Sequence, residues 1–132
     1  MDEAESVADD ELLYRRIPAS TDWYDPGTGE LDDQAFAPHK DRDLTGLSLY
    51  RAIFKTIEET AAGQPGKSYY VATLRARDIR AAGIEITRDD PGDPGHVVLP
   101  SLNGTNRKDD RTLKLQRVLA GLPLSVSGPF PP

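Results

Sequence analysis

A chain of 132 residues can bury one hydrophobic core but not two, so the sequence predicts a single domain. Its 22 acidic and 16 basic side chains give a formal charge of −6. This charge disfavours general coating of DNA or RNA, because such binding needs a basic surface. The absence of cysteine excludes disulfides, cysteine-based zinc sites and thiol nucleophiles.

The N-terminal segment bears on location. MDEAESVADDE is acidic, whereas a secretion signal begins with basic residues that are followed by an apolar stretch. No apolar run approaches the roughly 20 residues of a membrane-spanning helix. We therefore expect a cytoplasmic protein without membrane contact, in which residues 1–10 form a disordered acidic tail.

A short strand and a long loop should follow this tail. The run LLYRRI, residues 12–17, is typical of a strand and ends at Pro18. Residues 19–46 are rich in glycine and proline and predict an irregular segment, with Ala35 and Phe36 as its anchor in the core. A loop of this length in a small domain is usually either functional or wrongly assigned, and the sequence leaves both open.

The clearest helical pattern covers residues 48–63. Ser48 can accept a hydrogen bond from a free amide at the start, and Gly63 can end the helix in a left-handed conformation. Apolar residues recur at i, i+3, i+4, i+7 and i+11, which is typical of one face of an amphipathic helix. These residues are Tyr50, Ile53, Phe54, Ile57 and Ala61.

Two strands, a helix and a hairpin are predicted in the middle of the chain. Residues 68–76 are rich in β-branched and aromatic side chains, as expected of a central strand. Residues 75–83 predict a short helix that ends at Gly83. Residues 84–87 and 96–99 should then pair as a hairpin, because the intervening DPGDPG supplies proline and glycine for the reversal.

A last helix should span residues 108–121, with Leu115 and Leu119 on its apolar side. The proline-rich residues 124–132 are expected to form an extended tail. The predicted fold is therefore a small single α+β domain, residues 11–123, in which a short antiparallel sheet is packed by two or three helices.

His96 is the first candidate site residue. A histidine near Asp89, Asp90 and Asp93 could act as a general base or contact a phosphate near neutral pH. It could instead bond a loop carbonyl and pin the turn, which the sequence favours because no second catalytic group is fixed by spacing. The same acids lack the spacing of a calcium loop, so the sequence predicts no metal site and no cofactor.

The arginines form a second group of candidates. A guanidinium offers a planar fork that matches phosphate and carboxylate groups. If Arg16, Arg51 and His96 converged, they would form a pocket for a nucleotide-like anion. The alternative is that these arginines pair with the surplus acids on the protein's own surface.

Two further features point to a protein partner. Five cations between residues 107 and 117 could dock an acidic partner, or they could form an ordinary solvated helix face. An aromatic pair in the loop after the first strand could anchor an interface or fold over the core. The predicted partner-binding residues are Trp23, Tyr24, Arg107, Lys108, Arg111, Lys114 and Arg117.

Several short motifs over roughly residues 12–100 carry a family resemblance. They are LLYRRIP (12–18), QAF (34–36), GLSLYR (46–51), the run from Arg80 to Pro91, and PGHV (94–97). Together they resemble a set of small uncharacterised bacterial proteins with a YRRI-type start, an AF…LS middle and a DP…H turn before a late strand. Val97 departs from that pattern, which has alanine after the histidine, and the DPG turn is duplicated in this chain.

The resemblance implies an accessory role in bacterial defence or conflict loci. It also implies that a small set of residues belongs to the pattern, without saying whether they act in chemistry or in packing. These residues are Arg15, Arg16, Phe36, Ser48 and His96.

We therefore expect a non-enzymatic interaction module, an accessory subunit of a bacterial multi-protein system such as an anti-phage defence system. Its partner would be another protein encoded nearby. The alternative is a small enzyme directed at NAD, another nucleotide or RNA ends, in which Arg16 and Arg51 hold phosphate and His96 transfers protons. Nucleic-acid contact through the basic helix alone is the least favoured of the three, because of the net charge.

Overall fold

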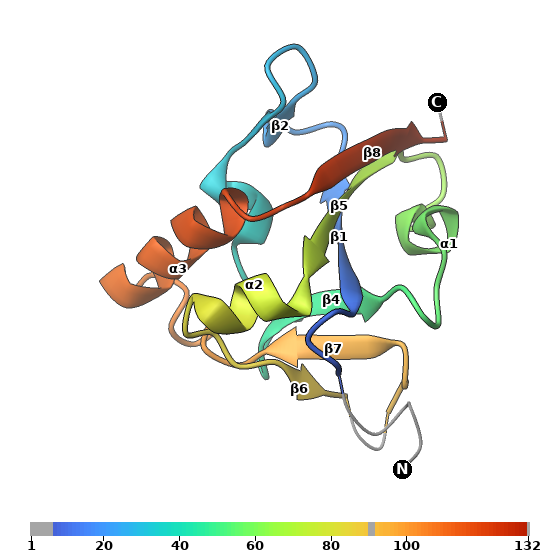
Figure 1. Ribbon diagram of the computed structural model, residues 1–132. Coiled ribbons are helices and arrows are strands. Elements are labelled where there is room, and N and C mark those ends of the chain that lie inside the picture. Colours follow the sequence, from blue (N-terminus) through green and yellow to red (C-terminus); the bar gives the residue numbers. More distant parts are fainter. Residues whose placement is uncertain (1–6, 90–91, 132) are drawn as a thin grey trace.

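The structure, a computed structural model, describes residues 7–89 and 92–131. Within this part of the chain, six antiparallel strands form a curled sheet (Figure 1). Their spatial order is β6 (Thr87–Arg88), β7 (His96–Leu99), β4 (Leu47–Arg51), β1 (Leu12–Pro18), β5 (Tyr69–Arg75) and β8 (Ser125–Phe130). The remaining elements are the hairpin strands β2 (Tyr24–Asp25) and β3 (Glu30–Leu31), the 3-10 helix η2 (Asp33–Phe36), and the helices α1 (Ile57–Ala61), α2 (Ala76–Ala81) and α3 (Asp110–Ala120).

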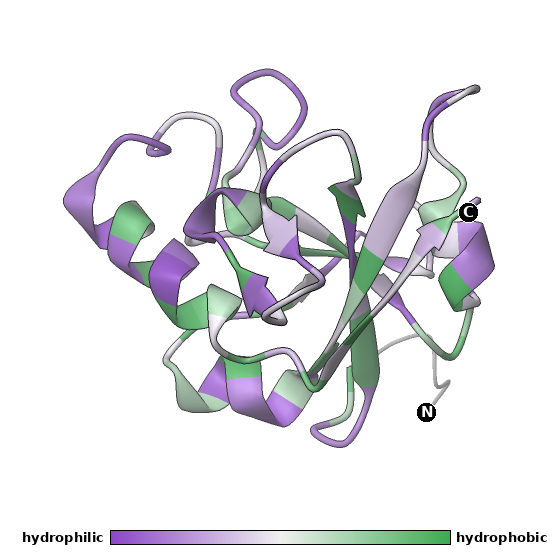
Figure 2. Ribbon diagram, turned by 90° about the horizontal axis from the view of Figure 1, so that it is seen from above, coloured by the Kyte–Doolittle hydropathy of each residue, from purple (hydrophilic) through white to green (hydrophobic). Residues whose placement is uncertain are grey.

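One face of this sheet carries the main core. Alternate residues of the central strands point to it, and Leu13 of β1 lies opposite Leu74 of β5 with both fully buried. Ile79 of α2, Leu119 of α3 and Phe36 of η2 complete the cluster. Figure 2 shows hydrophobic colour along the central strands and hydrophilic colour on the peripheral loops. The predicted anchoring of Ala35 and Phe36 in the core is confirmed.

The opposite face is covered over only part of its width. Ala61 of α1 packs with Tyr69 and Val71 of β5 in a second, smaller cluster. Helix α1 contacts β1, β5 and β8, which are the last three strands at one end of the strand order. In Figure 1, α1 lies on one side of β1 and β5, whereas α2 and α3 lie on the other. This arrangement leaves room for a cleft beside β1 and β4.

The predicted helix over residues 48–63 is wrong. Leu47–Arg51 form β4, with Leu47, Leu49 and Arg51 buried in the period of two that a strand requires. Ser48 is therefore not a helix cap. Of the expected apolar stripe, Ile53 and Phe54 are exposed in a turn.

The helix in this region, α1, has five residues and begins only at Ile57. Thr56 caps it by accepting a hydrogen bond from the Glu59 amide, and the Glu59 carboxylate accepts one from the Thr56 amide. The segment forms a strand because β4 pairs with β1 on one side and β7 on the other. This pairing buries Leu47 and Leu49, whereas a helix would place the apolar stripe of Tyr50, Ile53 and Phe54 inward instead.

Other predicted elements are close to the observed ones. The central strand is confirmed as β5, and the short helix after it is confirmed as α2, followed by Gly83 at φ +80°. The predicted hairpin forms between β6 and β7, but β6 is only Thr87–Arg88. The α+β class is confirmed, whereas the sheet is larger than the short one expected. Two residues of the predicted turn, Asp90 and Pro91, lie outside the described residues.

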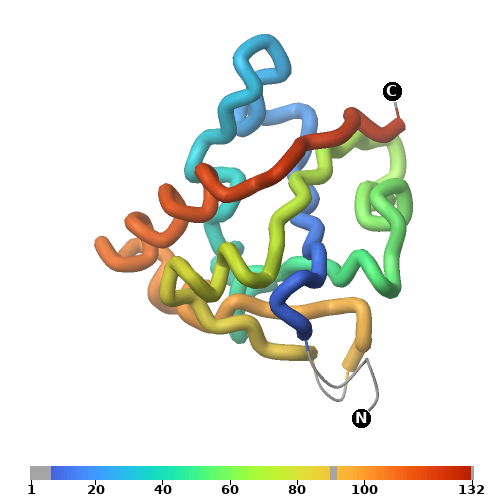
Figure 3. Tube along the Cα trace, viewed as in Figure 1, coloured from blue at the N-terminus to red at the C-terminus, as the bar shows by residue number. Residues whose placement is uncertain are grey.

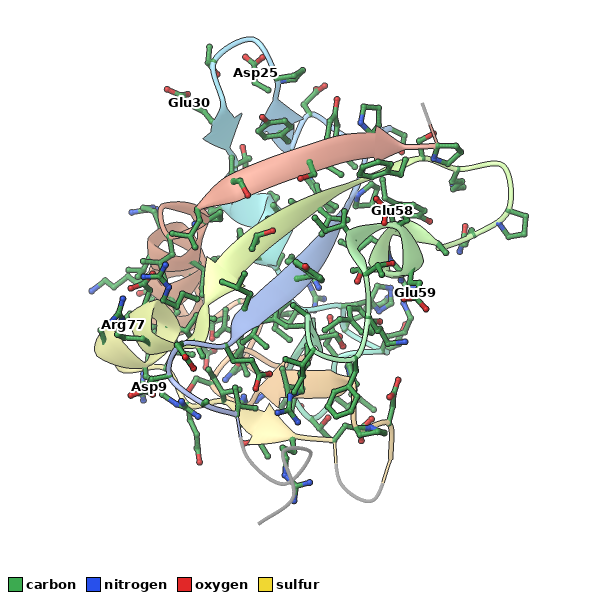
Figure 4. All side chains as sticks on the ribbon, turned by 45° about the vertical axis from the view of Figure 1, so that its right-hand side comes forward. Asp9, Asp25, Glu30, Glu58, Glu59 and Arg77 are labelled. Atoms are coloured by element: carbon green, nitrogen blue, oxygen red, sulfur yellow. The ribbon has the colours of Figure 1, made fainter. Side chains whose placement is uncertain are left out.

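Residues near both ends of the described chain join the fold. Val7 is buried against the main core, and the Asp9 carboxylate accepts a 2.7 Å hydrogen bond from Arg80. Figure 4 shows Asp9 beside Arg77, whose amide donates to the Asp9 carbonyl. Residues 124–132 were predicted to form an extended tail outside the domain. This prediction is wrong for Ser125–Phe130, which pair with β5 as strand β8. Residues 1–6 of the predicted acidic tail lie outside the described residues.

The long segment between β1 and β4 leaves the sheet and returns to it, as the blue-to-cyan tube in Figure 3 shows. It contains β2, β3 and η2, and it then forms a turn at residues 39–46. This turn is fastened to the core strand β4, because Ser48 donates a 3.2 Å hydrogen bond to Asp43. The segment thereby becomes one wall of the candidate site.

Candidate functional site

A cleft of about 1210 Å³ opens where β1 and β4 separate. The two strands pair only at Leu13–Arg51 and Tyr14–Tyr50, and beyond these positions the loop segments enter the gap. Parts of β1, β4 and β7 line the cleft together with the turn at residues 39–43 and the segment 64–69. Sequence-distant residues thus meet in one concave surface.

The cleft is cationic in an acidic protein. Four arginine and lysine side chains line it: Arg15, Arg16, Arg42 and Lys67. Asp43 is the only carboxylate among the described lining residues. None of the four cations has a described carboxylate oxygen within 4.0 Å. Both histidines of the chain, His39 and His96, line the same cleft.

Many of the protein's acids lie elsewhere. Asp25 and Glu30 lie at the β2–β3 hairpin, and Glu58 and Glu59 lie on α1 (Figure 4). None of these four lines the cleft. The overall charge of −6 therefore coexists with a local excess of positive charge, and the two properties describe different regions.

Two backbone carbonyls hold the guanidinium of Arg15, one of the cleft cations. Its Nε donates to the Ala35 carbonyl at 2.9 Å, and one terminal nitrogen donates to the Ser48 carbonyl at 3.2 Å. Burial lowers the pKa of Arg15, because it removes water from the cation, and the nearby Asp43 carboxylate opposes part of this effect. Neutral carbonyls orient the guanidinium without neutralising it.

The turn at residues 39–43 is rigidly bonded. The Asp43 carboxylate accepts from the His39 amide at 2.7 Å and from the Ser48 hydroxyl at 3.2 Å. The Nδ1 atom of His39 accepts from the amides of Asp41 and Arg42 at 3.1 and 3.2 Å. Two backbone donors at Nδ1 require a lone pair there, so the ring proton of His39 lies on Nε2.

His96 has the opposite arrangement. Its Nδ1 lies 2.9 Å from Asp89 Oδ2, and a carboxylate at that distance requires a proton on Nδ1. The ring is tilted against Tyr50, with 5.4 Å between the ring centroids. The His96 hydrogen bond lowers the pKa of Asp89, which keeps this carboxylate ionised.

Of the acids predicted to orient His96, Asp89 does so. Asp93 instead bonds the Gly95 amide and pairs with Lys55 at 3.5 Å, and Asp90 lies outside the described residues. The Asp89 amide also donates to the His96 carbonyl, so the contact helps to close the hairpin. His96 therefore combines the turn-pinning role with a position in a cleft.

The structure separates Arg51 from the other two predicted anion-binding residues. Arg16 and His96 line the cleft, but the Arg51 side chain is fully buried and does not. Its Nε and one terminal nitrogen donate to the two Glu11 carboxylate oxygens at 2.6 and 2.8 Å. The hypothesis that Arg51 holds phosphate beside Arg16 is not supported, because its fork already binds a carboxylate inside the protein.

The residues predicted to bind a partner fall into two groups. Trp23 packs against the main core and Tyr24 packs edge-on against Tyr70 at 4.8 Å, so neither is a free loop aromatic. Helix α3 begins at Asp110, and Arg107 and Lys108 lie in the turn before it. The exposed cations of the helix itself are Arg111, Lys114 and Arg117.

No protein-family model matches the chain, and no curated protein or solved structure is significantly similar to it. The resemblance to small bacterial proteins therefore stays a prediction. Its five pattern residues are nevertheless not scattered. Four of them line the cleft, whereas Phe36 is fully buried in the core. The four are Arg15, Arg16, Ser48 and His96.

Two properties of the described residues bear on other site types. None of their helices is both long and apolar enough to span a membrane. Within the same residues, no three histidine, cysteine, aspartate or glutamate side chains gather as a metal site would require.

Several cleft residues were not singled out from the sequence. His39, Arg42 and Lys67 occur in ordinary charged contexts, and Tyr50 was assigned to a helix that does not form. The available signal was the length of the 19–46 segment, which is typical of a loop that is either functional or wrongly assigned. That signal points to the segment but not to the residues within it.

Proposed function

We propose that the protein binds a phosphate-bearing nucleotide in the cleft between β1 and β4. The observation that carries this proposal is that four cations and both histidines line the cleft of a protein of net charge −6, whereas Asp43 is the only carboxylate among the described lining residues. Such an arrangement repels other cations and attracts anions. It costs folding free energy through like-charge repulsion, which a bound anion would offset.

Arg15 supports the same proposal. Arg15 is half-buried in the cleft wall, and the hydrogen bonds of its guanidinium go to neutral carbonyls rather than to a carboxylate. Arg16 is held nearby by the Tyr69 ring, 5.1 Å from its guanidinium carbon, and by a weak 3.4 Å bond to the Ala62 carbonyl. Both guanidinium groups keep donors for a ligand, and arginine forks match phosphate oxygens.

The lining also suits a base or a sugar. Trp23, Tyr50 and Tyr69 contribute aromatic rings to the cleft. Aromatic side chains stack on nucleobases, and a cation-rich groove tracks phosphates. The volume of about 1210 Å³ exceeds that of a typical small-molecule pocket, roughly 300–1,000 Å³, so the cleft has room for more than one nucleotide.

The test measures binding of ADP, with adenosine as the uncharged match, by isothermal titration calorimetry. We expect ADP to bind, adenosine to bind much more weakly, and added salt to weaken ADP binding. Arg16→Ala and Lys67→Gln should each weaken ADP binding by about 10- to 100-fold, the effect of losing a charged hydrogen bond of about 1.5–3 kcal/mol. Arg111→Gln on α3 is the matched control and should bind ADP normally.

Equal affinity of wild type and the cleft variants would contradict the proposal. So would the absence of ADP binding at millimolar concentration together with the absence of oligonucleotide binding. A thermal midpoint measured for each variant separates loss of the ligand contact from loss of the fold.

A second candidate function is docking of an acidic partner protein on α3. It is favoured by the exposed cations Arg111, Lys114 and Arg117, beside Val118, which is 43% exposed. Reversal of Lys114 and Arg117 to glutamate should weaken partner binding and leave the thermal midpoint nearly unchanged. Native mass spectrometry after co-expression with neighbouring genes would detect such a partner, and unchanged binding of the charge-reversed variant would exclude this helix.

A further inference from the structure

The chain has two histidines, and the fold holds them in opposite hydrogen-bonding states in one cleft. His39 accepts at Nδ1 from two backbone amides and therefore presents an N–H at Nε2. His96 donates at Nδ1 to the Asp89 carboxylate, so its neutral ring presents a lone pair at Nε2. One histidine is thereby set as a hydrogen-bond donor and the other as a proton acceptor.

Both histidines lie on segments that adjoin β4. His96 lies opposite Tyr50 in the β4–β7 ladder, so Ser48 is its diagonal neighbour on the same sheet face, about 7–8 Å away. Ser48 bonds Asp43, and Asp43 bonds the His39 amide. The two rings reach the cleft from different segments. His96 is on β7, which pairs with β4, and His39 is on the turn that the Ser48–Asp43 hydrogen bond fastens to β4.

We propose that the cleft cleaves single-stranded RNA, with His96 as the general base. This inference rests on the proposed nucleotide binding and names its substrate class. RNA fits the site for three reasons: the cleft holds more than one nucleotide, its cations match successive phosphates, and the substrate supplies its own nucleophile. The protein then needs only a base and donors for the phosphoryl oxygens.

The reaction is an internal transesterification. His96 Nε2 removes the proton of a ribose 2′-hydroxyl, and the 2′-oxygen forms a bond to the adjacent phosphorus. The bond from phosphorus to the 5′-oxygen breaks, and the leaving oxygen takes a proton from solvent water. The His96 imidazolium returns its proton to the hydroxide so formed. The products are a 2′,3′-cyclic phosphate and a 5′-hydroxyl.

The remaining groups stabilise charge or position the base. The Nε2–H of His39 and the arginine forks donate to the non-bridging phosphoryl oxygens as charge develops on them. Asp89 is a positioning residue, because it fixes the His96 tautomer and ring orientation. Among the described residues, Tyr50 is in ring contact with His96, Lys55 lies over the Tyr50 ring, and Asp93 and Arg88 lie on the adjoining turn and strand.

The test uses a fluorescently labelled pentaribonucleotide and the 2′-deoxy pentanucleotide of the same sequence, which can bind but has no internal nucleophile. His96→Asn keeps an amide donor where Nδ1 was and removes the base. His39→Asn keeps an acceptor for the two backbone amides and removes the Nε2 donor. Arg111→Gln on α3 is the control for the preparation, and each variant's thermal midpoint is measured.

We expect the wild type to cleave the ribonucleotide to a 2′,3′-cyclic phosphate and to leave the deoxynucleotide intact. His96→Asn should slow cleavage by about 10²–10⁴-fold, the usual contribution of a general base, a much larger factor than any loss of deoxynucleotide affinity. The rise of rate with pH that reflects deprotonation of the base should also disappear in this variant. His39→Asn should slow cleavage by about 10-fold or more and keep the pH-dependent rise.

Three outcomes would overturn the inference. If the deoxynucleotide binds but the ribonucleotide stays intact, the cleft binds nucleotides and does not cleave RNA. If wild type and His96→Asn preparations cleave equally, the activity does not use His96. If neither oligonucleotide nor ADP binds, the proposed function fails and the inference with it. Should His96→Asn have a lowered thermal midpoint, His96→Gln, which also lacks the base, replaces it.

Discussion

Two arginines on neighbouring strands have different surroundings: Arg51 of β4 is fully buried, whereas Arg15 of β1 is half-buried and lines the cleft. Arg51 is fully buried and binds both oxygens of Glu11, whose side chain is 5% exposed. Arg15 donates to two backbone carbonyls and has no described carboxylate within 4.0 Å. The protein therefore pairs Arg51 with a carboxylate of its own, whereas Arg15 is a cation that could contact the anion we propose as ligand.

The difference separates structural from functional charge. A cation paired inside the protein contributes to the fold only while both partners are present, because either one alone is a buried, uncompensated ion. A cleft cation without a carboxylate partner depends on no such ion pair, and under our proposal its charge acts mainly in ligand binding. Substitution of Arg51 should therefore lower the free energy of unfolding, whereas substitution of a cleft cation should mainly weaken ligand binding.

The largest effect is expected at Arg51. Arg51→Met leaves the Glu11 carboxylate buried without its partner and should lower the free energy of unfolding by about 3–5 kcal/mol. The double variant Glu11→Leu/Arg51→Met removes both charges and should recover much of that loss. Urea unfolding measures all three proteins. A loss below 1 kcal/mol for the single variant would show that the pair is not the structural element described here.

A smaller effect is expected at Gly46, which has φ +150° and joins the turn at residues 39–43 to β4. A Cβ at this position would lie 2.7 Å from the Leu99 carbonyl oxygen. Gly46→Ala should therefore cost about 1–3 kcal/mol in unfolding free energy and, because it displaces the turn, also weaken ADP binding. Gly29→Asn is the control, since Gly29 has positive φ but open space around it.

The fold was predictable where a pattern had one interpretation. The β5 run is dense in β-branched and aromatic residues, which favours only a strand, and the α2 segment ends in a glycine, which favours a short helix. The structure confirms both predictions. Residues 47–57 carry two periods at once. Their leucines alternate as in a strand, whereas Tyr50, Ile53, Phe54 and Ile57 repeat as in a helix. Only pairing with β1 and β7 decides between them, and this tertiary contact cannot be read from local sequence.

The candidate site was predictable only in part. Arg16 and the Asp89–His96 contact followed from residue type and proximity along the chain. His39 and Lys67 did not, because they enter the cleft through the separation of β1 from β4. Net charge gave no indication of the cleft, since a total of −6 says nothing about where the cations gather.

The cap of α1 should have an effect of about 1 kcal/mol. Thr56→Ala removes the side chain that accepts from the Glu59 amide, and caps of this type stabilise proteins by about 0.5–2 kcal/mol. The hydrogen bonds from Thr56 lower the pKa of Glu59. A depressed carboxyl pKa contributes stability above its unfolded value, and this contribution is lost as pH falls through the folded value.

The wild type should therefore lose its advantage over Glu59→Gln as the pH falls through the acidic range. Thermal midpoints measured between pH 7 and pH 3 test this, with Glu58→Gln as the neighbouring control. Parallel pH profiles for wild type and Glu59→Gln would show that the capping carboxylate does not contribute. Because neither Glu58 nor Glu59 lines the cleft, neither variant should change ADP affinity.

The smallest change in stability is expected at Arg42, on the exposed turn that lines the cleft. Arg42→Gln should change the unfolding free energy by no more than about 0.5 kcal/mol, as is usual for an exposed site. Any change should be stabilising, because the substitution relieves repulsion among cations that lack carboxylate partners. The same variant should weaken ADP binding measurably. A clear loss of stability with normal ADP binding would make Arg42 a structural cation like Arg51, and the cleft would lose one of the four charges on which its assignment rests.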